Sequence, residues 1–204
     1  MCFKTVNIRV TDKKIMSVRR EFWEIYRESL PVLIVALLGG LFAGLVLEQI
    51  IESVERFPGL LVMVPVFLAT RGNVYGALGG RIASGLHQGL IEPRFKRDSR
   101  LLNAIVASFV NGIGISVVIG VITWIALFAL GRDSALLVEL IAIMLVAGVL
   151  TSVVMIVGLL LLIFAGFRYG YDPDNLVGPI VTTLGDIFGM LFLLLSVTLV
   201  GVLL

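Results

Sequence analysis

Five long runs of apolar residues alternate with short polar stretches along this chain. Each run has at least the roughly 20 residues with which a helix crosses the ~30 Å hydrocarbon core of a bilayer. Because the polar stretches are short, we expect neighbouring helices to be antiparallel. The runs cover residues 31–50, 58–90, 101–130, 136–164 and 176–204.

The second run is too long for one straight span. Its roughly 33 residues would form a helix of about 50 Å, so we expect it to tilt, to extend beyond the bilayer or to break. Arg71-Gly72-Asn73 interrupts its apolar pattern. This tripeptide is the expected position of the break.

Residues 1–28 differ from the rest because they carry many charges of both signs. From Asp12 to Ser29 the apolar residues recur at helical spacing, which predicts an amphipathic helix on the membrane surface. Trp23 and Tyr26 suit the headgroup level. The chain is therefore predicted to be an all-α integral membrane protein, with a cytoplasmic N-terminal segment over 1–28 and a domain of five transmembrane helices over 29–204.

Composition supports membrane residence and excludes several functions. The chain is 59% hydrophobic and 15% charged, with a mean hydropathy of +1.09. A soluble domain of 204 residues needs far more polar surface. The sequence has no nucleophile–base pair, no phosphate-binding glycine loop and no metal-binding histidine motif, so we expect neither an enzyme nor a bound cofactor, and no nucleic-acid partner.

The distribution of Lys and Arg predicts the orientation in the membrane. Basic residues are frequent in the N-terminal segment and in the stretch 91–100, whereas the loops on the other side contain only Arg56 and Arg132 beside several acids. Cytoplasmic loops carry an excess of basic residues. We expect the N-terminus in the cytoplasm and the C-terminus outside, in a multi-pass protein of the cell membrane.

Asp186 is a lone carboxylate inside the last apolar run. An acid at the bilayer centre costs at least about 2.5 kcal/mol and usually serves an ion or proton path. Thr182 and Gly178 lie one and two turns away on the same helical face, and the resulting surface of oxygens suits a hard cation such as Mg²⁺. The alternative is a buried salt bridge from Asp186 to Arg71 or Arg81.

Asn73 lies in a pentad that resembles the one around Asp186. Gly72-Asn73-Val74-Tyr75-Gly76 and Gly185-Asp186-Ile187-Phe188-Gly189 lie in runs predicted to cross the membrane in opposite directions. Such a pair is typical of an inverted repeat whose halves meet near the midplane. Asn73 can therefore offer oxygen ligands to an ion, or it can form a hydrogen bond between helices.

Other polar and small residues favour structural roles. Asp174 or Asn175 is the expected N-cap of the last helix, with an acidic mouth for cations as the alternative. His87 stands alone in the sequence, which favours no ligand role. Small residues recur every four positions in the third run and predict close helix packing within the chain or between protomers. They are Ser108, Gly112, Ser116 and Gly120.

Several motifs occur together in the order and spacing of a known family. The stretch from Gly178-Pro179 to Gly185-Asp186, the preceding Asp172-Pro173-Asp174-Asn175, and Arg71-Gly72-Asn73 resemble the MgtE-type magnesium transporters and their eukaryotic solute-carrier relatives. The similarity extends over roughly residues 20–204. No cytoplasmic nucleotide- or magnesium-sensing domain of the bacterial type is expected in this chain.

This resemblance implies a homodimer of five-helix chains with the pore on the dimer axis. It implies that Asp186 binds hydrated Mg²⁺ and that oxygens of Gly178, Thr182 and Asn73 line the path. We therefore expect a transporter or channel for a divalent cation, Mg²⁺ first among them, which is a transported ion and not a cofactor. The alternatives are a proton- or sodium-coupled carrier of a small solute and a non-transporting membrane assembly subunit.

Overall fold

The structure is a computed structural model that describes residues 4–94 and 98–203, without the side chains of residues 4–17 and of Glu21, Glu24 and Glu28. The described residues form helices and connecting loops. The helices are α1 (Lys4–Ile51), α2 (Leu60–His87), α3 (Ser99–Ala129), α4 (Leu137–Arg168) and α5 (Pro173–Leu203). Each contains a stretch long and apolar enough to cross a membrane. The prediction of an all-α membrane protein with five spans is confirmed.

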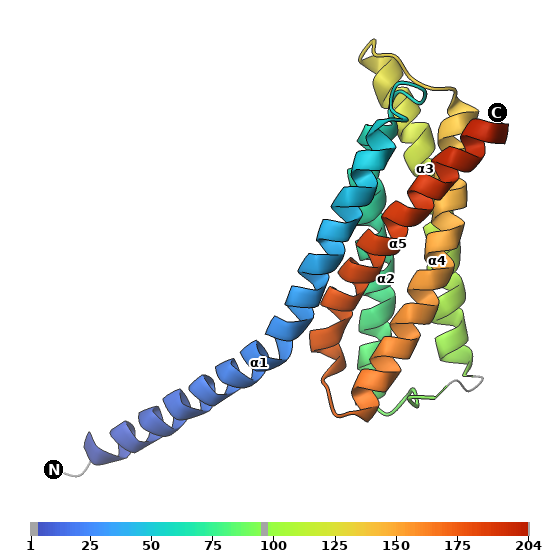
Figure 1. Cartoon of the computed structure of the whole chain (residues 1–204). Helices are drawn as coiled ribbons and strands as arrows, with labels where there is room; N and C mark the ends of the chain where they lie inside the picture. Colours follow the sequence, from blue (N-terminus) through green and yellow to red (C-terminus); the bar gives the residue numbers. More distant parts are fainter. Residues whose placement is uncertain (1–3, 95–97, 204) are drawn as a thin grey trace.

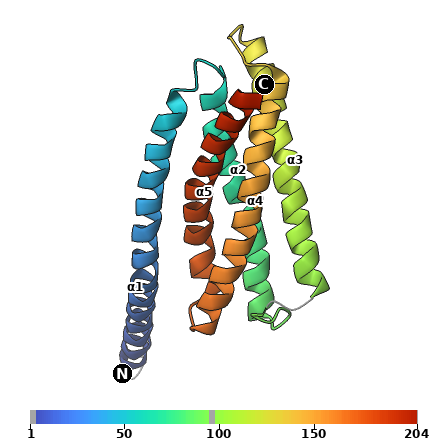
Figure 2. The same cartoon turned by 45° about the vertical axis from the view of Figure 1, so that its right-hand side comes forward.

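The helices form an up-and-down bundle in which α5 contacts three others. It packs against α1, α2 and α4, while α2 also contacts α3 and α4. Figure 2 shows α1 at one edge of the bundle and α3 at the other. Because α1 packs mainly against α5, its other faces are exposed, as expected of a helix surrounded by lipid.

The N-terminal segment and the first span form one continuous helix of 48 residues. Figure 1 shows the N-terminal part of α1 extending away from the other helices. The exposed rings of Phe22, Trp23 and Tyr26 contact one another there, with centroids 5.7 to 6.1 Å apart. An aromatic group of this kind suits the membrane–water interface. Its location at the membrane surface stays a prediction.

The second span contains no break. Helix α2 runs without interruption from Leu60 to His87 and includes Pro65 and Arg71-Gly72-Asn73. The predicted break is therefore wrong. A broken helix would leave backbone N–H and C=O groups unpaired at membrane depth, and one glycine costs only about 1 kcal/mol in a helix. The 28 residues span about 42 Å, so a tilt or an extension beyond the core accommodates the length.

A polar layer divides the apolar core into two clusters. One cluster includes Phe67 and Met144, and the other includes Tyr75 and Leu159. Between them lie fully buried polar side chains of α2, α3 and α4, which are Arg71, Ser116, Thr151 and Ser152. The small-residue pattern of the third span thus packs inside the chain, and it does so around a buried charge.

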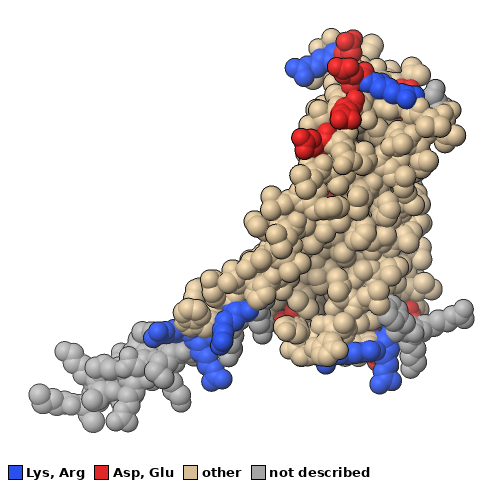
Figure 3. Space-filling view, viewed as in Figure 1, with Lys and Arg blue, Asp and Glu red and all other residues tan. Residues whose placement is uncertain are grey.

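The two ends of the bundle differ in charge. Figure 3 shows basic side chains along the lower end, where the N-terminus lies, and most of the visible acidic side chains at the upper end, mixed with basic ones. The C-terminus lies at the upper end (Figure 1). This asymmetry agrees with the charge distribution that predicted the orientation.

Candidate ion site

The oxygen-bearing residues predicted on the last helix share one face of α5. Gly178, Thr182 and Asp186 are four residues apart in a helix with no interruption from Pro173 to Leu203. Residues at this spacing lie one above the other, about 6 Å apart along the axis. Gly178 and Thr182 are exposed and Asp186 is half-buried. The described chain therefore presents these oxygens on its outer surface.

The start of α5 is fixed by a cap and a proline. The Oδ1 atom of Asp172 accepts a hydrogen bond from the backbone N–H of Asp174 (3.0 Å), and Pro173 occupies the first helical position. Proline suits this position because its missing N–H would have no partner there. The cap is therefore Asp172, and the prediction of Asp174 or Asn175 is wrong by two or three residues.

Threonine hydroxyls on α5 bond to the backbone of their own helix. Thr182 Oγ1 donates to the Gly178 carbonyl (3.0 Å), and Thr183 Oγ1 donates to the Pro179 carbonyl (2.8 Å). Such bonds satisfy a hydroxyl that has no water nearby. The hydroxyl oxygen of Thr182 still has lone pairs with which it can face an ion or an ion's water shell.

Helices α2 and α5 cross closely because glycines allow it. A Cβ added at Gly79 would overlap the Val177 side chain, one at Gly185 would lie 3.9 Å from the Arg71 Cβ, and one at Gly189 would lie 3.5 Å from the Phe67 ring. In each of these pairs the residue numbers add up to 256, which defines an antiparallel register. The two helices predicted to meet in opposite directions thus do so.

This register places Asn73 one turn from Asp186. Asn73 is level with Thr183, and Asp186 is level with Thr70, so the axial offset between Asn73 and Asp186 is about three residues or 4.5 Å. Asn73 is exposed. The four predicted site residues therefore lie on adjacent helices, with Asn73 and Asp186 about one turn apart in depth and Gly178 two turns from Asp186.

Asp186 has no protein partner in the part of the chain that the structure describes. It forms no hydrogen bond or ion pair there, and neither Arg71 nor Arg81 neutralises it. A charged acid at membrane depth is costly unless something pairs with it. The salt-bridge alternative for Asp186 thus has no support in this conformation.

Arg71 instead bonds to the neighbouring helices. Its Nη1 atom donates to the Gly112 carbonyl (3.2 Å) and lies 3.4 Å from Ser152 Oγ, and its Nη2 atom donates to Ser116 Oγ. The guanidinium also lies over the Phe67 ring, 4.4 Å from the centroid. Arg71 is therefore a structural residue that joins α2 to α3 and α4.

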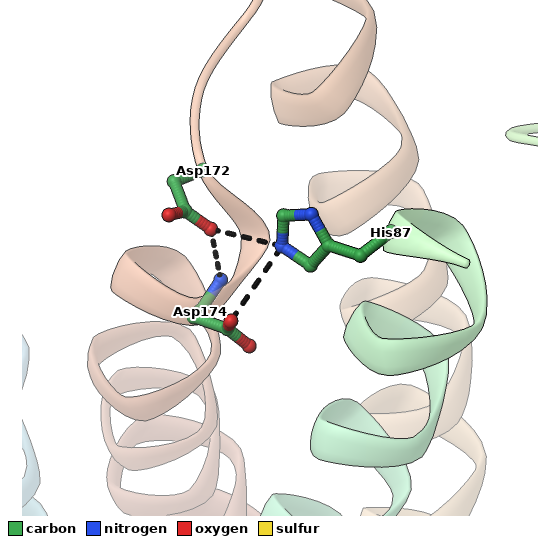
Figure 4. Close-up of polar contacts among 3 residues, drawn as sticks. All are labelled: His87, Asp172 and Asp174. Atoms are coloured by element: carbon green, nitrogen blue, oxygen red, sulfur yellow. Dashed lines mark hydrogen bonds and ion pairs between the residues drawn. The ribbon is translucent and has the colours of Figure 1, made fainter. Parts of the chain in front are cut away.

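A second polar group, which the sequence did not reveal, lies at the basic end of the bundle. Figure 4 shows the ring of His87, at the end of α2, facing the carboxylates of Asp172 and Asp174, at the start of α5. The His87 Nε2 atom is 3.2 Å from Asp172 Oδ1 and 3.5 Å from Asp174 Oδ2. The prediction that His87 stands alone is wrong, because its partners Asp172 and Asp174 are 85 and 87 residues away in the sequence.

These features define a multi-pass membrane protein with polar groups inside the helices that are long and apolar enough to cross a membrane. Residues 64–196 match the MgtE family, described as divalent cation transporters. The chain belongs to this family. It is also similar to solute carrier family 41 member 3 from Rattus norvegicus, with 24% identity over 179 residues that cover 82% of this chain. The chain spans 37% of the length of that relative. All four predicted site residues lie inside the family match.

Proposed function

We propose that this chain forms a homodimer that conducts Mg²⁺ across the cell membrane and that Asp186 is its principal ion-binding residue. The observation that carries the proposal is the position of Asp186. It is an unneutralised acid midway along α5, at the end of a row of exposed oxygens and one turn from Asn73.

The chemistry of the row suits a hard divalent cation. Mg²⁺ prefers oxygen ligands and dehydrates reluctantly, so it usually keeps several waters and binds through one or two carboxylates. Asp186 supplies the negative charge. The Thr182 hydroxyl, the Gly178 carbonyl and the Asn73 amide oxygen are neutral groups to which those waters can donate.

Exposure of the row supports a second copy of the chain. Polar groups that face hydrocarbon are unfavourable, so they usually line a cavity or an interface. On the same side, Gly72, Gly76 and Gly80 of α2 have open space where a Cβ would lie. Glycines four apart allow close approach of a partner helix. A second chain packed on α2 and α5 would bring two Asp186 side chains to one axis.

A site made of two facing carboxylates would also bind Mg²⁺ weakly enough to release it. Conduction requires a site that attracts the ion but lets it leave. A pair of acids attracts a divalent ion, and the water shell retained by Mg²⁺ limits direct bonding. In the proposed orientation the basic end of the bundle faces the cytoplasm.

Purified protein in liposomes tests this function. The measurement is the entry of Mg²⁺ into vesicles that contain a Mg²⁺-sensitive dye, with protein-free vesicles as the control. We expect flux that depends on protein and needs no sodium or proton gradient. Flux that requires one of these gradients would indicate a coupled carrier, and absence of flux from folded protein would contradict the proposal.

A further inference from the structure

The histidine and two aspartates at the basic end have the geometry of a metal site. Their three candidate ligand atoms, one from each residue, lie within 4.8 Å of one another. Figure 4 shows the His87 ring from α2 pointing between the two carboxylates of α5. Ligands about 2.0–2.1 Å from a tetrahedral Zn²⁺ lie roughly 3.3 Å apart. The separations of 3.2 and 3.5 Å between His87 Nε2 and the two carboxylate oxygens bracket this value.

A single two-centre hydrogen bond does not account for both contacts. The Nε2 atom of His87 carries at most one hydrogen, which the two carboxylate oxygens would have to share. Two carboxylate oxygens nevertheless face it. In the described part of the chain neither carboxylate has a Lys or Arg partner. A cation at the centre would bond to all three groups at once.

The ligand types select the metal. An imidazole nitrogen with two carboxylates suits Zn²⁺ and other divalent transition ions, whereas Mg²⁺ prefers oxygen ligands only. The side chains are 45%, 48% and 67% exposed for His87, Asp172 and Asp174, so water can complete the coordination. The hydrogen bond from the Asp174 N–H to Asp172 Oδ1 orients that carboxylate, as outer-shell contacts do in metal sites.

The three residues lie at one end of the proposed ion path. Asp174, Gly178, Thr182 and Asp186 are four residues apart on α5, so the cluster lies at the end of the face that carries the proposed ion path. His87 ends α2, the helix that carries Asn73. A metal held by both would fix the end of α2 to the start of α5.

We propose that His87, Asp172 and Asp174 bind a divalent transition-metal ion of the Zn²⁺ type, at a site separate from Asp186. The ion joins α2 to α5 at the basic end of the bundle. Binding of this ion does not depend on Mg²⁺ transport, so the two proposals can fail independently.

Calorimetric titration of the purified full chain with Zn²⁺ tests the site directly. The background variant is Cys2→Ser, because a thiol near the N-terminus is a competing ligand. We expect one Zn²⁺ per chain and an affinity that falls at least about tenfold in His87→Gln and in Asp174→Asn. The control is Asp133→Asn, an exposed acid at the opposite end, which should leave the affinity unchanged.

Two results would overturn the proposal. One is Zn²⁺ binding of equal affinity in the background protein, His87→Gln and Asp174→Asn, all shown to be folded by circular dichroism. The other is Mg²⁺ binding at this site as tightly as Zn²⁺. Because the three side chains are exposed, these substitutions remove little packing and the variants should fold.

Discussion

Arg71 on α2 donates a hydrogen bond to the hydroxyl of Ser116 on α3, deep in the bundle, and has no bond to Asp186. The positive charge of Arg71 is therefore stabilised by carbonyl and hydroxyl dipoles and by the Phe67 ring. Asp186 is left available on the outer side of the α2–α5 pair. The structure thus separates a structural cation, Arg71, from the proposed ion-binding carboxylate, Asp186.

The packing around Arg71 leaves no room for an added methyl group at Gly148. A Cβ at Gly148 would overlap the Ser116 hydroxyl and lie 3.1 Å from Arg71 Nη2. We expect Gly148→Ala to destabilise the folded protein by about 1–3 kcal/mol. Denaturation of the purified protein in detergent measures this change.

Gly114 provides the matched control because a Cβ there would have no neighbour within 4 Å. Gly114→Ala should be neutral or stabilising by up to about 1 kcal/mol, since alanine favours a helix more than glycine does. Equal stability of Gly148→Ala and Gly114→Ala would contradict the tight packing around Arg71.

The dimer proposal makes a prediction for the exposed glycines of α2. A Cβ at Gly76 would have no neighbour within 4 Å in the chain itself, whereas a leucine there would separate two chains packed on this face. We expect Gly76→Leu to weaken dimerisation at least about tenfold, or ~1.4 kcal/mol. Fluorescence energy transfer between labelled chains in liposomes measures this, and Gly114→Leu on α3 is the control. Unchanged dimerisation of Gly76→Leu would exclude this face from the interface.

Transport should weaken in acid. A carboxylate binds a metal ion only when it is deprotonated, so protons compete with Mg²⁺ for the Asp186 pair. Two carboxylates that share one site hold a proton more readily than a single one does, so at a fixed low Mg²⁺ concentration the flux should fall as the pH is lowered from about 8 to about 5. A higher Mg²⁺ concentration should restore it, because the competition is for one site.

Equal pH inside and outside the vesicles removes any contribution from a proton gradient. Flux that does not change over this range would argue against a paired-acid site. Loss of flux that Mg²⁺ cannot restore would indicate acid unfolding in place of competition.

The sequence predicts the features that depend on local composition. The five spans, the difference in charge between the ends and the shared face of Gly178, Thr182 and Asp186 all follow from apolar run length and helical period. The pairing of α2 with α5 also follows, because matching pentads occur in helices of opposite direction. These features need no knowledge of contacts between distant residues.

The features that the sequence did not predict depend on the tertiary structure. The contacts of Arg71 with Gly112 and Ser152 join residues 41 and 81 positions apart. The group of His87 with Asp172 and Asp174 forms only because α2 ends where α5 begins. The prediction of a helix break at Gly72 was wrong. In an apolar environment, keeping all backbone hydrogen bonds outweighs the low helix propensity of one glycine. A signal for His87 did exist, since both helices have polar ends on the same side of the membrane.

The most direct test of the account is the Mg²⁺ flux of Asp186→Ala beside the wild type and Asp133→Ala, each reconstituted at equal density. Asp133 is an exposed acid outside the spans, so its loss controls for net charge. We predict wild-type flux in Asp133→Ala and a loss of at least about a hundredfold in Asp186→Ala, which corresponds to ~2.7 kcal/mol. Wild-type flux in a folded Asp186→Ala protein would contradict the central role of this carboxylate.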